Sequence, residues 1–78
     1  MNALAFGIAK EIVGNSSVKI ELDKSATVRD FKTLLEKEYP AFKKLGSYMI
    51  AVNNAYAADE TTINLNDEVA IIPPVSGG

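Results

Sequence analysis

The chain ends in Pro-Pro-Val-Ser-Gly-Gly, and the reactive group of this segment is the α-carboxylate of Gly78. A free carboxylate is a poor electrophile. An ATP-dependent partner would convert it to an acyl-adenylate, from which a sulfur or nitrogen nucleophile displaces AMP. Glycine suits such a tip because Gly77 and Gly78, without a Cβ, pass through a narrow channel and approach a reacting centre closely. The sequence therefore predicts chemistry at Gly78 that other proteins carry out.

The residues before Gly77 and Gly78 have the composition of a stiff, extended segment. Pro73 and Pro74 fix their own φ angles and push the preceding residue towards extended conformations. From Pro73 onwards the chain would reach roughly 20 Å if fully extended. We expect a single domain over residues 1–74 and a flexible, extended tail over residues 75–78. Pro73 and Pro74 at the end of the domain, with Val75, Ser76 and Gly77 of the tail, would position Gly78.

The composition argues against most other kinds of site. The chain of 78 residues contains no cysteine and no histidine, which excludes disulfides, thiolate metal sites and the usual nucleophile and general base. We therefore expect no metal site, no bound cofactor and no catalysis by the chain alone. The net charge is −2 and the basic residues are interspersed with acids, so no nucleic-acid partner is expected.

The hydropathy pattern gives no sign of a membrane partner. No apolar run approaches the roughly 20 residues that a spanning helix needs. The apolar N-terminal stretch lacks a basic leader and includes Lys10 and Glu11, so it reads as a first strand and not as a signal peptide. Together with the absence of cysteine, these features lead us to expect a cytoplasmic protein.

Alternating and helical periodicities divide the chain into elements that would carry the tail. Leu4, Phe6 and Ile8 alternate with small residues, which predicts a strand with one buried face, and a short helical turn closed by Gly14 follows. Further strands are expected over residues 17–23, 49–52, 55–57 and 69–72. Asn53 and Asn54 form a plausible tight turn because asparagine tolerates positive φ.

One main helix is predicted between the second and third strands. Apolar residues recur at helical spacing from Val28 to Tyr39, with charged residues on the opposite side. Thr27 is a favourable N-cap, and Asp30 stands where a capping box places an acid. Pro40 cannot continue the helix, so it should end near Tyr39.

These elements predict an α+β fold, in which a mixed sheet of four to five strands packs on one helix. The last strand, Val-Ala-Ile-Ile, does not alternate, which is typical of a central strand that is covered on one face and partly covered on the other. If it lies beside the first strand, Ala5, Gly7, Ala70 and Ile72 should point away from the helix. Small and apolar side chains there would form a docking surface.

Four segments together resemble the ubiquitin-like β-grasp proteins, and most closely the small, sulfur-carrying subunit of molybdopterin synthase in the MoaD/ThiS-like family. They are "FGIAKEIVG", "TVRDFKTLL", "AVNNAYA" and, most specifically, "LNDEVAIIPPVSGG". The resemblance implies the β-grasp fold. It also implies that an ATP-dependent activating enzyme adenylates Gly78 and that a sulfurtransferase system converts it to a thiocarboxylate.

The resemblance further implies a partner and a destination for the sulfur. The tail would enter the large, catalytic synthase subunit and deliver sulfur to cyclic pyranopterin monophosphate, within a heterotetramer of two small and two large subunits. Phe6 and Ile72 are the partner contacts expected on the folded domain. The chain departs from the family pattern at Asn66, where glycine is common, and at Ile71 and Ile72, where aromatic residues are common. The aliphatic residues would reshape the partner surface.

Three alternatives remain open at this point. The sulfur carriers of thiazole biosynthesis share the fold and the Gly-Gly end but usually lack the Pro-Pro-Val-Ser approach. A ubiquitin-like modifier would use the same adenylate to attach Gly78 to lysines of target proteins. A binding module without end chemistry would carry its two glycines by chance.

Overall fold

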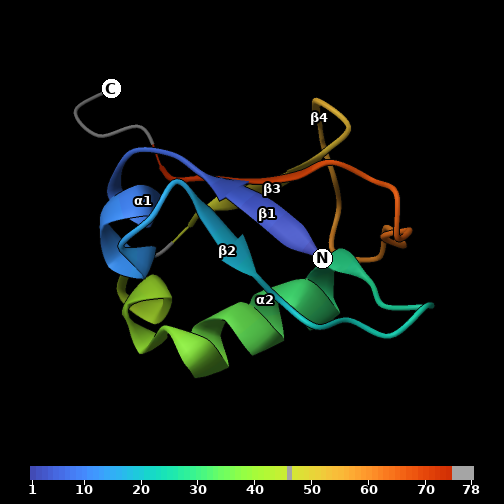
Figure 1. Ribbon diagram of the computed structural model, residues 1–78, viewed down its shortest axis with the longest axis horizontal. Helices are drawn as coiled ribbons and strands as arrows, with labels where there is room; N and C mark the ends of the chain where they lie inside the picture. The colour runs from blue at the N-terminus through green and yellow to red at the C-terminus, as the bar shows by residue number, and fades with distance from the viewer. Residues whose placement is uncertain (46, 75–78) are drawn as a thin grey trace.

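The computed structural model describes residues 1–45 and 47–74, which form one mixed sheet packed on a helix (Figure 1). The elements in chain order are β1 (Asn2–Ala5), α1 (Ile8–Val13), β2 (Ser17–Lys19), α2 (Val28–Glu38), the 3₁₀ helix η1 (Pro40–Leu45), β3 (Met49–Val52), β4 (Ala55–Tyr56) and β5 (Val69–Ile72). The predicted Val69–Ile72 strand and the short strand before it are confirmed, and so is the α+β class.

The sheet places the last strand at its centre. The strand order is β2-β1-β5-β3-β4, with β5 parallel to β1 and antiparallel to β3. The helix α2 crosses one face of this sheet and leaves the other face open (Figure 1). The expected juxtaposition of the first and last strands is therefore confirmed, as is the β-grasp arrangement that the resemblance implied.

The buried face of β1 is the opposite of the predicted one. Ala3 and Ala5 face the helix and are almost fully buried, whereas Leu4 is 40% exposed. Phe6 lies beyond the strand, and Ile8 begins α1, closed by Gly14 as expected. The predictions that Leu4, Phe6 and Ile8 are buried and that Ala5 points outward are wrong. The alanines take the inner face because the space below the sheet is filled by large side chains of α2 and η1.

β2 is shorter than the predicted strand over residues 17–23. It pairs with β1 in antiparallel fashion only from Ser17 to Lys19, and the helical turn expected before Gly14 is the helix α1, which connects the two strands. Ile20 and Met1 exchange the last backbone contacts, in which the terminal ammonium donates to the Ile20 carbonyl oxygen at 3.0 Å.

The ends of α2 follow the sequence signals. The Thr27 hydroxyl accepts a hydrogen bond from the Asp30 N–H, and the Asp30 carboxylate accepts one from the Thr27 N–H, which completes the predicted capping box. The helix ends at Glu38, immediately before the cap residue Tyr39 and Pro40. The helix is therefore fixed at both ends by local chemistry.

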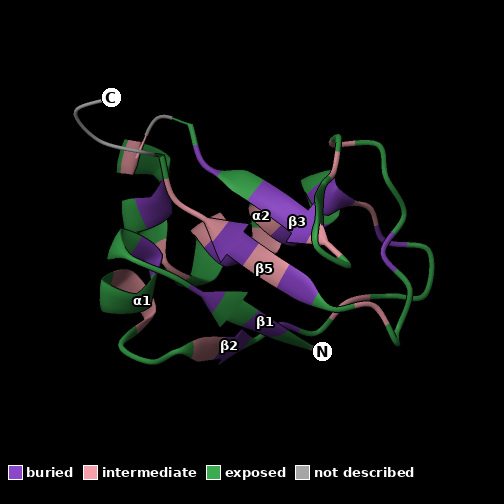
Figure 2. Cartoon of the chain, turned by 90° about the horizontal axis from the view of Figure 1, so that it is seen from above, coloured by how far each residue is buried: buried purple, intermediate pink, exposed green. Residues whose placement is uncertain are grey.

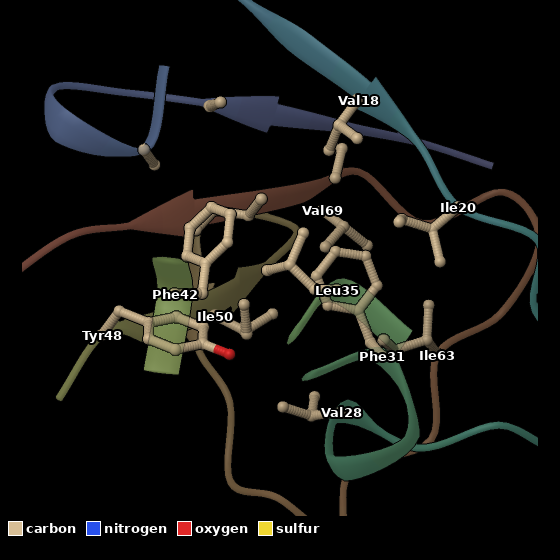
Figure 3. Packing of buried hydrophobic residues seen from close by; sticks show 14 residues of the cluster. Val18, Ile20, Val28, Phe31, Leu35, Phe42, Tyr48, Ile50, Ile63 and Val69 are labelled. Carbon is tan, nitrogen blue, oxygen red and sulfur yellow. The ribbon is translucent and has the colours of Figure 1, made fainter. Parts of the chain in front are cut away.

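The core lies between α2, η1 and the inner face of the sheet (Figure 3). Phe31 and Leu35 of α2 and Phe42 of η1 are its largest fully buried side chains, together with Ile50 and Ile71 of the sheet. Tyr48 packs against the Phe42 ring, with centroids 5.4 Å apart, and its hydroxyl donates to the Glu36 carboxylate at 2.6 Å. Burial and the adjacent Glu36 raise the pKa of Tyr48 well above its ordinary value, so this phenol stays protonated.

In the described part of the chain, no helix is long and apolar enough to cross a membrane. The same residues contain no group of three or more acids, histidines or cysteines arranged to hold a metal ion.

Candidate functional site

The end of β5 is where the predicted tail leaves the folded domain. Ile72 is the last strand residue, and Pro73 and Pro74 follow it directly. Val75, Ser76, Gly77 and Gly78, to which we assigned the chemistry and most of the approach, lie outside the described residues. The structure therefore places the base of the predicted tail, Pro73 and Pro74, directly after the central strand.

The base of the tail passes close to the turn between β1 and α1. Gly7 has a φ of 55°, and a Cβ built on it would lie 3.2 Å from Cγ of Pro73. A glycine at position 7 thus allows both the left-handed backbone and the close approach of the proline. Because Phe6 directly precedes Gly7, this predicted contact residue lies next to the point where the chain leaves the sheet at Pro73.

The open face of the sheet carries an apolar surface that extends to Pro73, where the tail leaves the sheet. Cross-strand register places Leu4, Ala70, Ala51 and Tyr56 in one row across β1, β5, β3 and β4. Ile72 and Met49 form the next row, nearer to Pro73. Figure 2 looks on to this face and shows β2, β1, β5 and β3 side by side, with α2 behind them. We call this surface the open face.

The middle of the open face is hollow. A pocket of about 390 Å³ lies over Ala51 and Ala70, whose short side chains leave the space. Its remaining lining residues are Leu4, Phe6, Asn54, Tyr56, Glu68 and Ile72. Phe6 is 48% exposed and Tyr56 is 68% exposed, so large apolar surface faces outward without cover from the rest of the described chain. Such a surface is typical of a protein interface.

Phe6 and Ile72, the two residues predicted as partner contacts, both line the hollow. The predicted outward position of Ala70 and Ile72 is confirmed. Leu4, Met49 and Tyr56 also belong to the open face but were not predicted. Met49–Val52 is apolar throughout, so its sequence has no alternation that could have shown Met49 to face outward. Tyr56 could not be placed from its two-residue strand, in which no alternation is measurable.

A hydrogen-bonded clamp fixes the start of β5. Asn53, with a φ of 53° in the predicted turn, donates from Nδ2 to the Asp67 carboxylate at 2.9 Å and accepts the Glu68 N–H at its Oδ1. Asp67 also accepts the N–H of Asn64 at 2.8 Å. The clamp therefore ties the turn before β4 to the loop that enters the central strand.

The clamp leads to a prediction about acid stability. Hydrogen bonds from the Asn64 N–H and the Asn53 amide lower the pKa of Asp67. The stabilisation is present above the unfolded pKa of about 4 and is lost as pH falls through the lower folded pKa. We expect Asp67→Asn to lower the unfolding midpoint near neutral pH, with the difference from the natural chain shrinking below about pH 4. Thermal unfolding of both proteins, from neutral pH to below about pH 4, measures this difference in midpoint.

Asp23→Asn is the matched control, since the Asp23 side chain is exposed and makes no hydrogen bond within the described residues. If both variants shifted the midpoint equally at every pH, the clamp would have no special role in stability.

The architecture and the site together define a class. A five-stranded mixed sheet on one helix, with a central last strand running into a Pro-Pro segment beside an open apolar face, is a ubiquitin-like β-grasp domain. Residues 4–78 match the ThiS family, and the chain belongs to that family.

Similar proteins agree with this assignment. The chain is 40% identical over 80 residues to the molybdopterin synthase sulfur carrier subunit of Dictyostelium discoideum, covering 96% of this chain and 92% of the relative. A putative molybdopterin converting factor subunit 1 from Pyrococcus furiosus superposes with a TM-score of 0.84 at 26% identity, covering 95% of each chain. The small archaeal modifier protein 1 of Methanosarcina acetivorans gives 0.81 at 26% identity, covering 99% and 94%.

Proposed function

We propose that this chain is the sulfur carrier subunit of a molybdopterin synthase and acts in molybdenum cofactor biosynthesis in the cytoplasm. The observation that carries the proposal is the 40% identity to a relative of that name over nearly the whole chain. The family match runs through to Gly78 and so includes the Pro-Pro-Val-Ser-Gly-Gly segment, which supports a role for that segment. The folded domain would then serve to present Gly78.

The proposed chemistry takes place at Gly78 in the active sites of partners. The carboxylate attacks the α-phosphate of ATP bound to an activating enzyme, which gives the acyl-adenylate and pyrophosphate. Sulfur at the oxidation level of hydrosulfide, supplied by a sulfurtransferase system, then displaces AMP and leaves a thiocarboxylate. The thiocarboxylate sulfur attacks an electrophilic carbon of cyclic pyranopterin monophosphate in the large subunit, where it takes the place of an oxygen substituent. Water then cleaves the acyl C–S bond, so the sulfur stays on the substrate and Gly78 returns to a carboxylate. The chain itself binds neither ATP nor metal in this scheme.

The open face is the proposed docking surface for the large subunit. Phe6 and Ile72 stand beside the base of the tail, so a partner that covers them would also receive Pro73 and the residues after it. Val75, Ser76 and Gly77 would then guide Gly78 into the active site. A heterotetramer of two small and two large subunits is the assembly we expect.

Reconstitution tests this function. The chain is prepared with a thiocarboxylate at Gly78 and mixed with the large subunit of the same organism and cyclic pyranopterin monophosphate. The expected result is molybdopterin, detected as its fluorescent oxidation product, with no product from the carboxylate form. Absence of product from the thiocarboxylate, with a large subunit shown to be active with another carrier, would reject the proposal.

A protein-modifier role is the second candidate, and the likeness to the small archaeal modifier protein 1 favours it. The same adenylate at Gly78 would be attacked by a lysine amine, and an isopeptide bond would form with loss of AMP. Higher-mass conjugates that carry the Gly78 carbonyl on lysine, recovered from the native host, would support this role.

A further inference from the structure

The hollow of the open face has a polar end that the docking proposal does not explain. Glu68 precedes the central strand, and it lines the pocket together with Asn54. Because Val69 faces the helix and Ala70 faces outward, alternation places Glu68 on the open face as well. An acid and an amide residue thus stand at one edge of a surface whose other lining residues are apolar or aromatic.

The Glu68 carboxylate has no intramolecular partner in residues 1–45 and 47–74. Its backbone N–H is held by Asn53, but the ion pairs in this part of the chain join Lys19 to Glu21, Arg29 to Glu60 and Lys32 to Asp59. When a partner covers the open face, this carboxylate is withdrawn from water. Such burial is unfavourable unless the partner supplies a cation or hydrogen-bond donors.

The shape and chemistry of the hollow select one kind of side chain. Its floor of Ala51 and Ala70 is apolar, its polar end holds the acceptors of Glu68 and Asn54, and the ring of Tyr56 stands at its edge. An arginine has an aliphatic stem for the floor and a planar guanidinium that pairs with a carboxylate through two hydrogen bonds. The guanidinium also stacks on aromatic rings, which a lysine ammonium does less well.

We propose that the hollow receives an arginine side chain of the large subunit, with its stem on Ala51 and Ala70 and its guanidinium between the Glu68 carboxylate and the Tyr56 ring. The proposal rests on the proposed function for the identity of the partner. In this arrangement Glu68 is a positioning residue, because its ion pair sets the register in which the base of the tail meets the partner.

Binding of the full chain to the large subunit, measured by titration calorimetry, tests this contact. At about 50 mM salt, Glu68→Gln is expected to raise Kd about tenfold, since it keeps the size of the side chain but removes its charge. At about 300 mM salt the difference should become smaller, because an ion pair at an interface edge is screened. Tyr56→Leu keeps apolar area but lacks the ring face, and it should raise Kd about threefold.

Glu38→Gln is the matched control for the loss of one negative charge. Glu38 is exposed on α2, on the other side of the sheet, and within the described residues it makes no ion pair. Its Kd should stay within about twofold of that of the natural chain. Each variant is checked by thermal unfolding before the titration.

Two results would overturn the proposal. One is a Glu68→Gln variant that binds as tightly as the natural chain at low salt, and the other is a Tyr56→Leu variant that shows no loss. Either would leave the sulfur-carrier function intact, because the natural chain would still bind its partner. If the natural chain itself failed to bind the large subunit, both the proposed function and this inference would fall.

Discussion

One alanine added after Gly78 is expected to reduce sulfur delivery to the background level while leaving the fold unchanged. The extension converts the Gly78 carboxylate into a peptide carbonyl, which no longer offers an oxygen to ATP, and the new terminus has a Cβ that a narrow channel excludes. Both activation and molybdopterin formation should be lost. Activation is measured as the ATP-dependent release of pyrophosphate in the presence of the activating enzyme.

The extended variant also provides its own control. Its open face is unchanged, so it should still bind the large subunit and unfold at the same temperature as the natural chain. Full molybdopterin formation by the extended chain would contradict the proposed mechanism, because that mechanism requires a free carboxylate at Gly78.

Phe6→Ala is expected to weaken binding to the large subunit by about 2 kcal/mol, or about 30-fold in Kd. Phe6 is 48% exposed in the free chain, stands at the hollow and adjoins the base of the tail. Aromatic residues at the centre of an interface contribute most of its binding free energy. Titration calorimetry at fixed salt concentration measures the change.

Leu65→Ala is the matched control for this truncation. Leu65 is even more exposed, at 68%, but it lies in the loop before β5 and does not line the hollow. Its Kd should change by less than about twofold. Equal losses for Phe6→Ala and Leu65→Ala would show that the open face has no special role in docking.

Local signals predicted the elements whose ends are set by nearby residues. The Thr27–Asp30 capping box and Pro40 fixed the ends of α2, and Asn53 and Asn54 adopt the positive φ angles expected of their turn. The strand Val69–Ile72 was recognised as central because both of its faces are apolar. The helix ends and the turn depend on interactions within a few residues, and the strand was recognised from the composition of its own four residues.

The errors arose where distant parts of the chain decide the outcome. The phase of β1 depends on the rings of Phe31 and Phe42 below the sheet, which favour Ala3 and Ala5 on the inner face. The Asn53–Asp67 clamp joins residues that are 14 positions apart. In the candidate site, Phe6 and Ile72 were predicted, whereas the places of Tyr56 and Glu68 in the hollow depend on strand pairing that periodicity does not reveal.

The intact mass of the protein purified from its native host tests the central claim most directly, since that claim places the transferred atom on Gly78. The predicted result is a fraction of chains in which one oxygen is replaced by sulfur. Fragmentation should locate the exchange at Gly78, and alkylation should add one alkyl group to these chains only. A terminus that carries only oxygen, in cells that are actively making molybdopterin, would contradict the account.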